Sequence, residues 1–330
     1  MSVIAVENLQ KRYGDNFAVK GLDLQVEEGE VFAILGPNGA GKTSTVEILE
    51  GHRRRSGGNV TVLGFDPETG GRAFRERIGI VLQEAGFDEA FTARELLCQF
   101  ARFYPKPRDV DELLALVGLE EKADARSRTL SGGQRRRLDL ALGLVGDPDL
   151  LFLDEPTTGF DPSARRQAWE LVAGLCRGGK TVVLTTHYME EAYRLADRVA
   201  LVVGGRLVAQ GTPDELVGRS TGGRSFIRFD LPSSATLSDL PAVSGEVELD
   251  GEQVAVRSLD PTRDLRALTG WALERGLPLE HLHLERRSFE DAYLELVAQA
   301  EVGAEGSAPP VELVQAAAGR FASVEGGRDA

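Results

Sequence analysis

The sequence predicts an α/β protein with a mostly parallel sheet, an inserted helical lobe and a small second domain of the α+β class. Strands alternate with helices over residues 1–218, which is typical of a covered parallel sheet. Residues 84–146 interrupt this alternation with helical spacing alone. After Gly218, a stretch rich in Ser, Gly and Arg leads into shorter elements. The 330 residues therefore suit one large and one small domain.

The first elements are strands followed by one helix. Val3–Leu9 and Ala18–Val26 have the spacing of strands, and Val31–Leu35 is a short apolar run bounded by turn residues. Gly36 ends that third strand, and helical spacing begins near Thr43. We therefore expect a strand, a glycine loop and a helix in direct succession.

The helical lobe and the strands after it follow from the apolar spacing. Three apolar clusters predict three helices in the lobe: Leu96, Leu97 and Phe100; Leu113, Leu114 and Val117; Leu138, Leu142 and Val145. Asp161 and Pro162 then predict a helix start by an N-cap and a first-turn proline, and Gly178 predicts its end. Three more strands are expected at Leu150–Leu153, Thr181–Thr185 and Val199–Val203.

Residues 219–300 are expected to form the small domain. Val247–Val256 predicts a hairpin around Asp250 and Gly251. Ser288 and Asp291 resemble a capping box that opens a helix through Leu296. Residues 301–330 are dominated by Gly, Ala and Pro, so we expect a flexible tail there. No motif separates a dimer-stabilising role of this domain from a regulatory one.

Charge and composition exclude several function classes. The net charge of −14 and the pI of about 4.9 argue against a primary role on nucleic acid. The arginine runs at 53–55 and 135–137 are expected to be solvated faces. The two cysteines lack metal-ligand spacing, and no secretory signal is expected, which favours a reducing cytoplasm. No stretch has the roughly 20 apolar residues of a membrane span, so any membrane role needs a partner.

One motif predicts a phosphate-binding loop. The pattern G-x-x-x-x-G-K-[ST] lets backbone N–H groups surround a polyphosphate at a helix N-terminus. Its lysine would reach the β and γ phosphates, and its hydroxyl would bind magnesium. An ordinary glycine-rich turn is the alternative, but the strand before and the helix after favour the phosphate loop. The pattern is matched by Gly36, Pro37, Asn38, Gly39, Ala40, Gly41, Lys42 and Thr43, and we expect Ser44 to join the same site.

A pair of acids ends the apolar strand that begins at Leu150. Asp154 and Glu155 would lie at the carboxyl edge of the sheet, where open α/β sheets bind ligands. Asp154 suits a magnesium shell, and Glu155 suits the activation of water. Two acids can also simply end a strand, and this pair alone does not separate the two roles.

A second anion-binding helix start precedes Arg135. It consists of Ser131, Gly132, Gly133 and Gln134 after Leu130. One chain thus has two candidate phosphate-binding loops. This combination resembles the ABC ATPase family, and the resemblance covers about Val3–Leu216. The resemblance implies a P-loop NTPase cassette with a RecA-like core, an antiparallel β subdomain and an inserted helical subdomain. It also implies that the protein binds ATP and Mg²⁺ and forms a homodimer. In this dimer the loop at residues 131–134, the signature loop of the family, binds the γ-phosphate held by the other subunit.

The resemblance assigns further roles to single residues. Tyr13 matches the adenine-stacking aromatic, and Gln83 matches the glutamine that senses magnesium and the membrane partner. Asp161 matches the aspartate of the subunit interface, and His187 matches the switch histidine. Glu155, His187 and Gln83 are thus the expected catalytic residues, and Thr43, Gln83 and Asp154 the expected magnesium site.

Within the family, three classes compete: a transporter motor, a translation or DNA-repair ATPase, and a non-hydrolysing binder. The chain has one cassette and none of the insertions of the second class, and it has the Glu155 and His187 that the third should lack. Residues 157–162 and 288–294 resemble exporter ATPases of the daunorubicin-resistance type. This implies a separate polytopic permease, a place at the cytoplasmic face of the plasma membrane, and a hydrophobic drug, antibiotic or lipid as substrate.

Overall fold

The computed structural model describes residues 2–81, 86, 90–221, 225–251, 253–285 and 288–305. Internal contacts divide the chain into two compact units. The first contains residues 2–213 and 299–305, and the second contains residues 214–298. In the described part of the chain, no helix has the length and apolar character needed to span a bilayer.

The first unit contains a three-stranded antiparallel sheet in the order β2-β1-β4. Ile4 and Val6 alternate with exposed neighbours, so one face of β1 enters the core. The two strands expected here, β1 and β2, are confirmed, and each is longer than the apolar pattern alone predicted, whereas β4 was not predicted. The bounds are Ser2–Tyr13 for β1, Asn16–Glu27 for β2 and Gly57–Val62 for β4.

A six-stranded sheet in the order β5-β6-β7-β3-β8-β9 forms the centre of this unit. Only β9 is antiparallel to its neighbour, which confirms the mostly parallel sheet. All side chains of β3 and β7 are buried, including the threonines at the two ends of β7, which explains why the other residues of these strands are apolar. The bounds are Val31–Leu35 for β3, Ile78–Val81 for β5, Leu150–Asp154 for β6, Thr181–Thr185 for β7, Arg198–Val203 for β8 and Arg206–Gly211 for β9.

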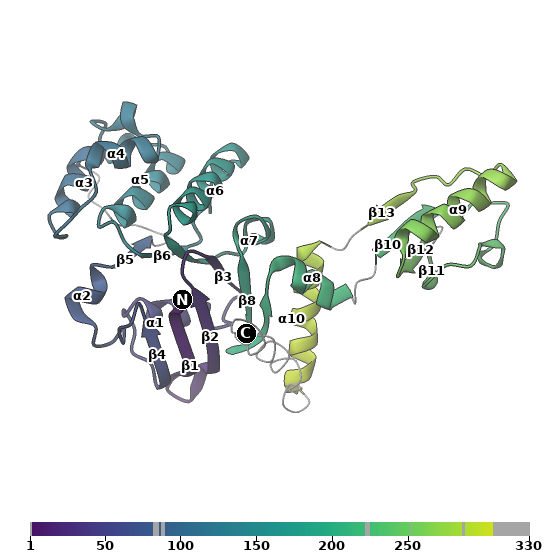
Figure 1. The fold of residues 1–330 in the computed structure, drawn as a ribbon, viewed down its shortest axis with the longest axis horizontal. Coiled ribbons are helices and arrows are strands. Elements are labelled where there is room, and N and C mark those ends of the chain that lie inside the picture. Colours follow the sequence, from purple (N-terminus) through teal and green to yellow (C-terminus); the bar gives the residue numbers. More distant parts are fainter. Residues whose placement is uncertain are drawn as a thin grey trace, which may run out of the picture. The chain divides into compact units, whose positions relative to one another are not determined.

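The helical lobe is confirmed, and Figure 1 shows its helices gathered beyond the β5–β6 edge of the sheet. It consists of α3 (Ala93–Ala101), α4 (Val110–Leu116) and α5 (Gly132–Leu144), with short 3-10 turns at Glu120–Lys122 and Ser127–Thr129. The remaining helices of this unit are α1 (Lys42–Leu49), α2 (Gly71–Arg75), α6 (Pro162–Arg177) and α7 (Met189–Leu195). The expected N-cap of α6 is confirmed, because the Asp161 side chain accepts from Ser163 N and Ala164 N.

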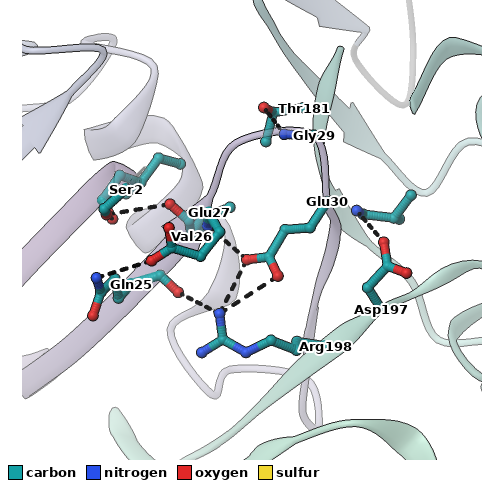
Figure 2. A network of polar contacts seen from close by, with 11 residues as sticks. Ser2, Gln25, Val26, Glu27, Gly29, Glu30, Thr181, Asp197 and Arg198 are labelled. Atoms are coloured by element: carbon teal, nitrogen blue, oxygen red, sulfur yellow. Dashed lines mark hydrogen bonds and ion pairs between the residues drawn. The ribbon is translucent and has the colours of Figure 1, made fainter. Parts of the chain in front are cut away.

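A polar network joins the antiparallel sheet to the central sheet at the turn before β3 (Figure 2). The Glu30 carboxylate accepts from Arg198 Nη1 at 3.1 Å and from the backbone N–H of Glu27 at 2.7 Å. Burial raises the pKa of Glu30, and Arg198 opposes that rise. The Val31 N–H donates to Asp197 Oδ2 at 2.8 Å. The network therefore fixes where β3 begins, and with it where the loop after β3 emerges.

The second unit is built on a four-stranded antiparallel sheet in the order β11-β12-β10-β13. Ile227, Phe229, Val254, Val256 and Leu268 form its core, with Leu268 supplied by α9. The hairpin around Gly251 is confirmed by the pairing of β11 with β12. The bounds are Ser225–Asp230 for β10, Glu246–Asp250 for β11, Gln253–Ser258 for β12, His283–Glu285 for β13 and Pro261–Arg275 for α9, with a 3-10 turn at Leu237–Asp239.

Two further helices carry the chain across the boundary between the units: α8 (Pro213–Thr221) and α10 (Phe289–Glu305). The expected cap of α10 is confirmed, because Ser288 Oγ accepts from Asp291 N at 3.1 Å and Asp291 Oδ2 accepts from Ser288 N at 3.0 Å. The helix continues beyond the expected Leu296 to Glu305, and residues 306–330, most of the expected tail, lie outside the described part.

Candidate functional site

The loop between β3 and α1 has a backbone that only glycine allows at two positions. Gly41 has a φ of +100°, and a Cβ there would lie 2.3 Å from the Ala18 carbonyl oxygen. A Cβ on Gly36 would lie 2.0 Å from the Val202 carbonyl oxygen. The glycines of the motif therefore let the loop pack against β2 and β8 while it turns into α1.

Lys42 is the first residue of α1, and its ammonium group lies within the curve of that loop. Its Nζ donates to the Gly36 carbonyl at 2.6 Å and to the Pro37 carbonyl at 3.0 Å. Burial lowers the pKa of Lys42, while the negative charges of Glu155 and Asp154 oppose that shift. The structure thus brings the cation of the glycine loop close enough to both acids for electrostatic interaction.

The acids lie at the carboxyl edge of the sheet, as the sequence predicted. Asp154 ends β6, and its carboxylate accepts a hydrogen bond from the Thr185 hydroxyl at the end of β7. Glu155 follows in the left-handed region with a φ of +47°, and its N–H donates to the Thr185 carbonyl at 3.0 Å. Sequence reasoning did not single out Thr185, because a threonine in an apolar strand has an ordinary β-branched role.

His187 and Thr158 hold the two oxygens of the Glu155 carboxylate. His187 Nδ1 lies 3.1 Å from Glu155 Oε1, and the Thr158 hydroxyl donates to Oε2 at 3.2 Å. The Glu155 side chain keeps 24% of its surface exposed, so one side remains open to water. A carboxylate that is oriented by two neighbours and still reaches solvent is suited to accept a proton from a bound water.

Tyr13 lies at the end of β1, next to the start of α1. Its hydroxyl is 3.1 Å from Ser44 Oγ, which brings two of the predicted binding residues together. Lys11 Nζ and the Arg53 guanidinium lie 4.9 and 5.3 Å from the ring centroid. The ring is 41% exposed, so it is a surface aromatic rather than a core residue.

The second glycine loop forms the N-terminus of α5. Ser131 is its N-cap, and Ser131 Oγ accepts from Gln134 N at 3.3 Å while Gln134 Oε1 accepts from Ser131 N at 3.0 Å. Ser131 and Gly132 are exposed, and a Cβ on Gly132 would meet no atom within 4 Å. This helix start therefore opens to the surface and is accessible to another molecule.

Two predictions from the sequence are not confirmed by the structure. Gln83 lies outside the described residues, so its expected catalytic and metal roles stay predictions. The expectation that residues 135–137 form a solvated face is wrong for Arg136, whose side chain is buried. Its position three residues before Asp139 and four before Leu140 places it on the inner face of α5, and helical spacing would have shown this.

A groove of about 380 Å³ lies between the end of α1, strand β5 and the lobe helices α3 and α5. Burial raises the pKa of Asp139 in its wall to about 7. Oδ1 of Asp139 receives no hydrogen bond from any residue that the structure describes. Glu50 also has a pKa raised by burial, and its carboxylate is 3.3 Å from His52 Nδ1. The groove thus combines buried acids with the exposed ring of Phe100.

Comparison with known proteins supports the fold. The family described as ABC transporter matches residues 19–158, and the family described as ABC transporter domain-containing protein-like, C-terminal domain, matches residues 225–288. The Nod factor export ATP-binding protein I of Burkholderia orbicola is 42% identical over 305 residues, covering 90% of this chain and 98% of that protein. The daunorubicin resistance ATP-binding protein DrrA3 of Streptomyces coeruleorubidus is 39% identical over 303 residues, covering 89% and 96%.

Solved structures agree. An ATP-binding subunit of an ABC transporter aligns with a TM-score of 0.61 at 25% identity, covering 67% of this chain and 93% of that one. The cbiO1 protein from Clostridium perfringens, part of the ABC transporter complex cbiONQ, aligns with a TM-score of 0.59 at 30% identity, covering 65% and 90%. A dimeric ATP-binding cassette bound to ADP and Pi in a post-hydrolysis state aligns with a TM-score of 0.56 at 25% identity, covering 63% and 98%.

Proposed function

This chain belongs to the ABC transporter ATP-binding proteins of the Nod factor export and daunorubicin resistance type, and we propose that its ATP hydrolysis drives the export of a hydrophobic drug, antibiotic or lipid through a separate membrane subunit. It is the ATPase subunit of an ABC exporter. The convergence of Lys42, Glu155 and His187 at one sheet edge supports the hydrolysis of ATP, and the similarity to export proteins supports the export. The relatives reported above are transport proteins, which favours an exporter over the alternative of a translation or repair ATPase.

Each site residue has a role in the proposed reaction. The loop 36–44 holds the phosphates of ATP, with Lys42 leaving its loop carbonyls to bind the β and γ phosphates. Glu155 orients and deprotonates the attacking water, and His187 holds the Glu155 carboxylate. Mg²⁺ binds proteins through one or two carboxylates plus substrate phosphates, and Asp154 with the hydroxyl of Thr43 is a donor set of this kind.

We propose that two chains form the active unit. Lys42 belongs to one phosphate loop, while Ser131 caps an exposed helix start that is open to a second molecule. The N–H groups and the dipole of such a helix favour an anion. ATP would then lie between the loop 36–44 of one chain and residues 131–134 of the other. The exposed Asp161, at the N-cap of α6, lies at the same interface in this arrangement.

Tyr13 is expected to stack on the adenine of ATP, and its substitution tests this. The Tyr13→Ala variant should bind ATP about 10-fold more weakly, since stacking on an aromatic ring is worth about 1–3 kcal/mol per base. Tyr13→Trp should keep wild-type affinity, because it retains the ring face while losing the contact with Ser44. Titration with a fluorescent ATP analogue measures both. Equal ATP affinities of the two variants would show that Tyr13 does not stack on adenine and is an ordinary surface aromatic.

We also propose that the groove beside α3 receives a segment of the membrane subunit. Phe100 offers apolar surface there, and Glu50 and Asp139 place two buried carboxyl groups in its wall. A docking segment that combines an apolar side chain with a lysine or arginine would complement both features, because the cation would pair with the buried acid. The predicted magnesium-sensing residue, Gln83, comes just before the lobe in the sequence, which would link docking to the nucleotide.

Crosslinking tests this docking model in native membranes. In a Cys98→Ser, Cys176→Ser background, Phe100→Cys is expected to crosslink to a polytopic membrane protein. Leu273→Cys, which is 82% exposed on α9 of the second unit, serves as the matched control and should give much less product. Mass spectrometry of the product identifies the partner. Crosslinks that arise only from Leu273→Cys would reject the groove as the docking site.

A further inference from the structure

Arg136 connects α5, the helix that begins at the signature loop 131–134, to the backbone of Asp154 and Glu155. Its Nη2 donates to the carbonyl of Asp154 at 2.7 Å and to that of Glu155 at 3.0 Å, and its Nε donates to the carbonyl of Pro156 at 3.1 Å. The residue is only 8% exposed. One guanidinium group therefore binds three successive carbonyl oxygens at the end of β6.

The left-handed conformation of Glu155 explains why these carbonyls converge. Glu155 has a φ of +47°, so the backbone changes direction directly after β6. The carbonyl oxygens of Asp154, Glu155 and Pro156 therefore point to one side. Buried carbonyls without donors are costly, and their partial charges repel one another. The planar guanidinium offers several N–H donors in a fixed fork and keeps its charge in the interior. Arg136 thus stabilises the strained conformation that places the Glu155 carboxylate.

The same side chain belongs to a helix whose N-terminus, a short way before Arg136, would bind nucleotide in the proposed dimer. Ser131 and Arg136 are five residues apart on α5, a rise of about 7.5 Å. A displacement of Ser131 along the helix axis is therefore transmitted to the guanidinium, and from there to the Glu155 backbone. Asp139, also on α5, lies 3.9 Å from Arg136 Nη1 and adds electrostatic support.

We propose that Arg136 is the positioning residue that couples the two nucleotide sites of the dimer. In one chain, Ser131 binds the ATP held by the partner's loop, while Glu155 acts on the ATP held by the chain's own loop. Arg136 fixes the position of Glu155 relative to α5. Occupancy of one nucleotide site therefore sets the position of the Glu155 carboxylate, which activates water, in the other site. This coupling rests on the proposed shared-site dimer.

The first test separates positioning from binding in the full-length protein. Arg136→Lys keeps a charge but replaces the fork with a shorter point donor that does not span three carbonyls. We expect kcat to fall about 10- to 100-fold, because a displacement of about 1 Å in a catalytic group costs about 100-fold. The Kd for ATP should stay within about 2-fold, because Lys42 and its loop are unchanged. Arg166→Lys, at an exposed position on α6, is the control and should match the wild type.

The second test measures the coupling directly. Dimers are assembled from differently tagged chains, one of which carries Lys42→Ala, so that only one site binds ATP. In the wild-type background, the rate per competent site should fall about 5-fold or more when the other site is empty, a typical size for allosteric coupling. When the hydrolysing chain carries Arg136→Lys, the rate should no longer depend on the other site, within about 2-fold.

The outcomes separate this inference from the proposed function. If Arg136→Lys keeps wild-type kcat, or loses ATP binding together with kcat, the positioning role is overturned. If occupancy of the second site still changes the rate in Arg136→Lys dimers, or never changes it in the wild type, the coupling is overturned. Failure of a Glu155→Gln variant to dimerise with ATP would instead reject the shared-site dimer. An ATP-bound dimer of the Glu155→Gln, Arg136→Lys double variant is expected, because coupling is not needed to bind ATP.

Discussion

Glu155→Gln is expected to lower ATP turnover about 1,000-fold, since a positioned general base contributes about 10²- to 10⁴-fold. Glutamine keeps the size of the side chain and can still contact His187 and Thr158, but it cannot accept the proton of the attacking water. Binding should be preserved, because Lys42 and the loop that holds the phosphates are intact. The variant should therefore accumulate with intact ATP as a dimer, which size-exclusion chromatography with and without ATP detects.

A second substitution in the same background tests whether the site is shared. Ser131→Arg places a bulky side chain at the exposed start of α5, where the phosphates of the partner's nucleotide would lie. The Glu155→Gln, Ser131→Arg protein should stay monomeric with ATP, whereas Glu155→Gln, Arg166→Lys should dimerise like the single variant. Wild-type turnover in Glu155→Gln would contradict its role as base. A dimer of the Ser131→Arg variant that forms with or without ATP would place the interface elsewhere.

Lys42→Ala is expected to abolish turnover, with a loss of at least about 100-fold, because a charged donor that stabilises transferring phosphate is worth about 10²- to 10³-fold. The ammonium group is partly desolvated and is held against the Gly36 and Pro37 carbonyls, so it is poised to exchange these acceptors for phosphate oxygens. The phosphate-release rate at saturating ATP gives the loss in turnover, and equilibrium dialysis with labelled ATP gives the loss in affinity.

Lys180→Ala is the control for this substitution. Lys180 precedes β7 at the opposite edge of the same sheet, where it pairs with Asp147 at 2.9 Å. Its removal takes away an equal charge without touching the phosphate loop, so activity should stay within about 2-fold of wild type, as for other surface substitutions. Near-normal ATPase activity of Lys42→Ala would reject the phosphate-loop assignment for residues 36–43.

Much of the fold was readable from local patterns. The apolar run of β3 and the three apolar residues at the centre of β7 predicted buried strands, because a parallel sheet covered on both faces needs such runs. The cap at Asp161 marked the start of α6 because an N-cap side chain satisfies N–H groups only two and three residues away. The short β4 and β5 were not predicted, since their pairing depends on partners far along the chain.

The sequence by itself determined the chemistry of the phosphate loop, of the two acids at the end of β6 and of the second glycine loop. Each of these features consists of consecutive residues, so its backbone conformation depends on local sequence. Only the tertiary structure decided which side chains meet. Thr185 binds Asp154, and Tyr13 reaches Ser44, across distances in sequence that no periodicity reports. Arg136 looked like one of three solvated arginines, yet its surroundings are the carbonyls that the left-handed Glu155 turns inward. The burial of a side chain and the direction of a carbonyl group depend on packing between segments that are distant in sequence. The contacts of Arg136 with these carbonyls are therefore seen only when α5 and β6 are placed together.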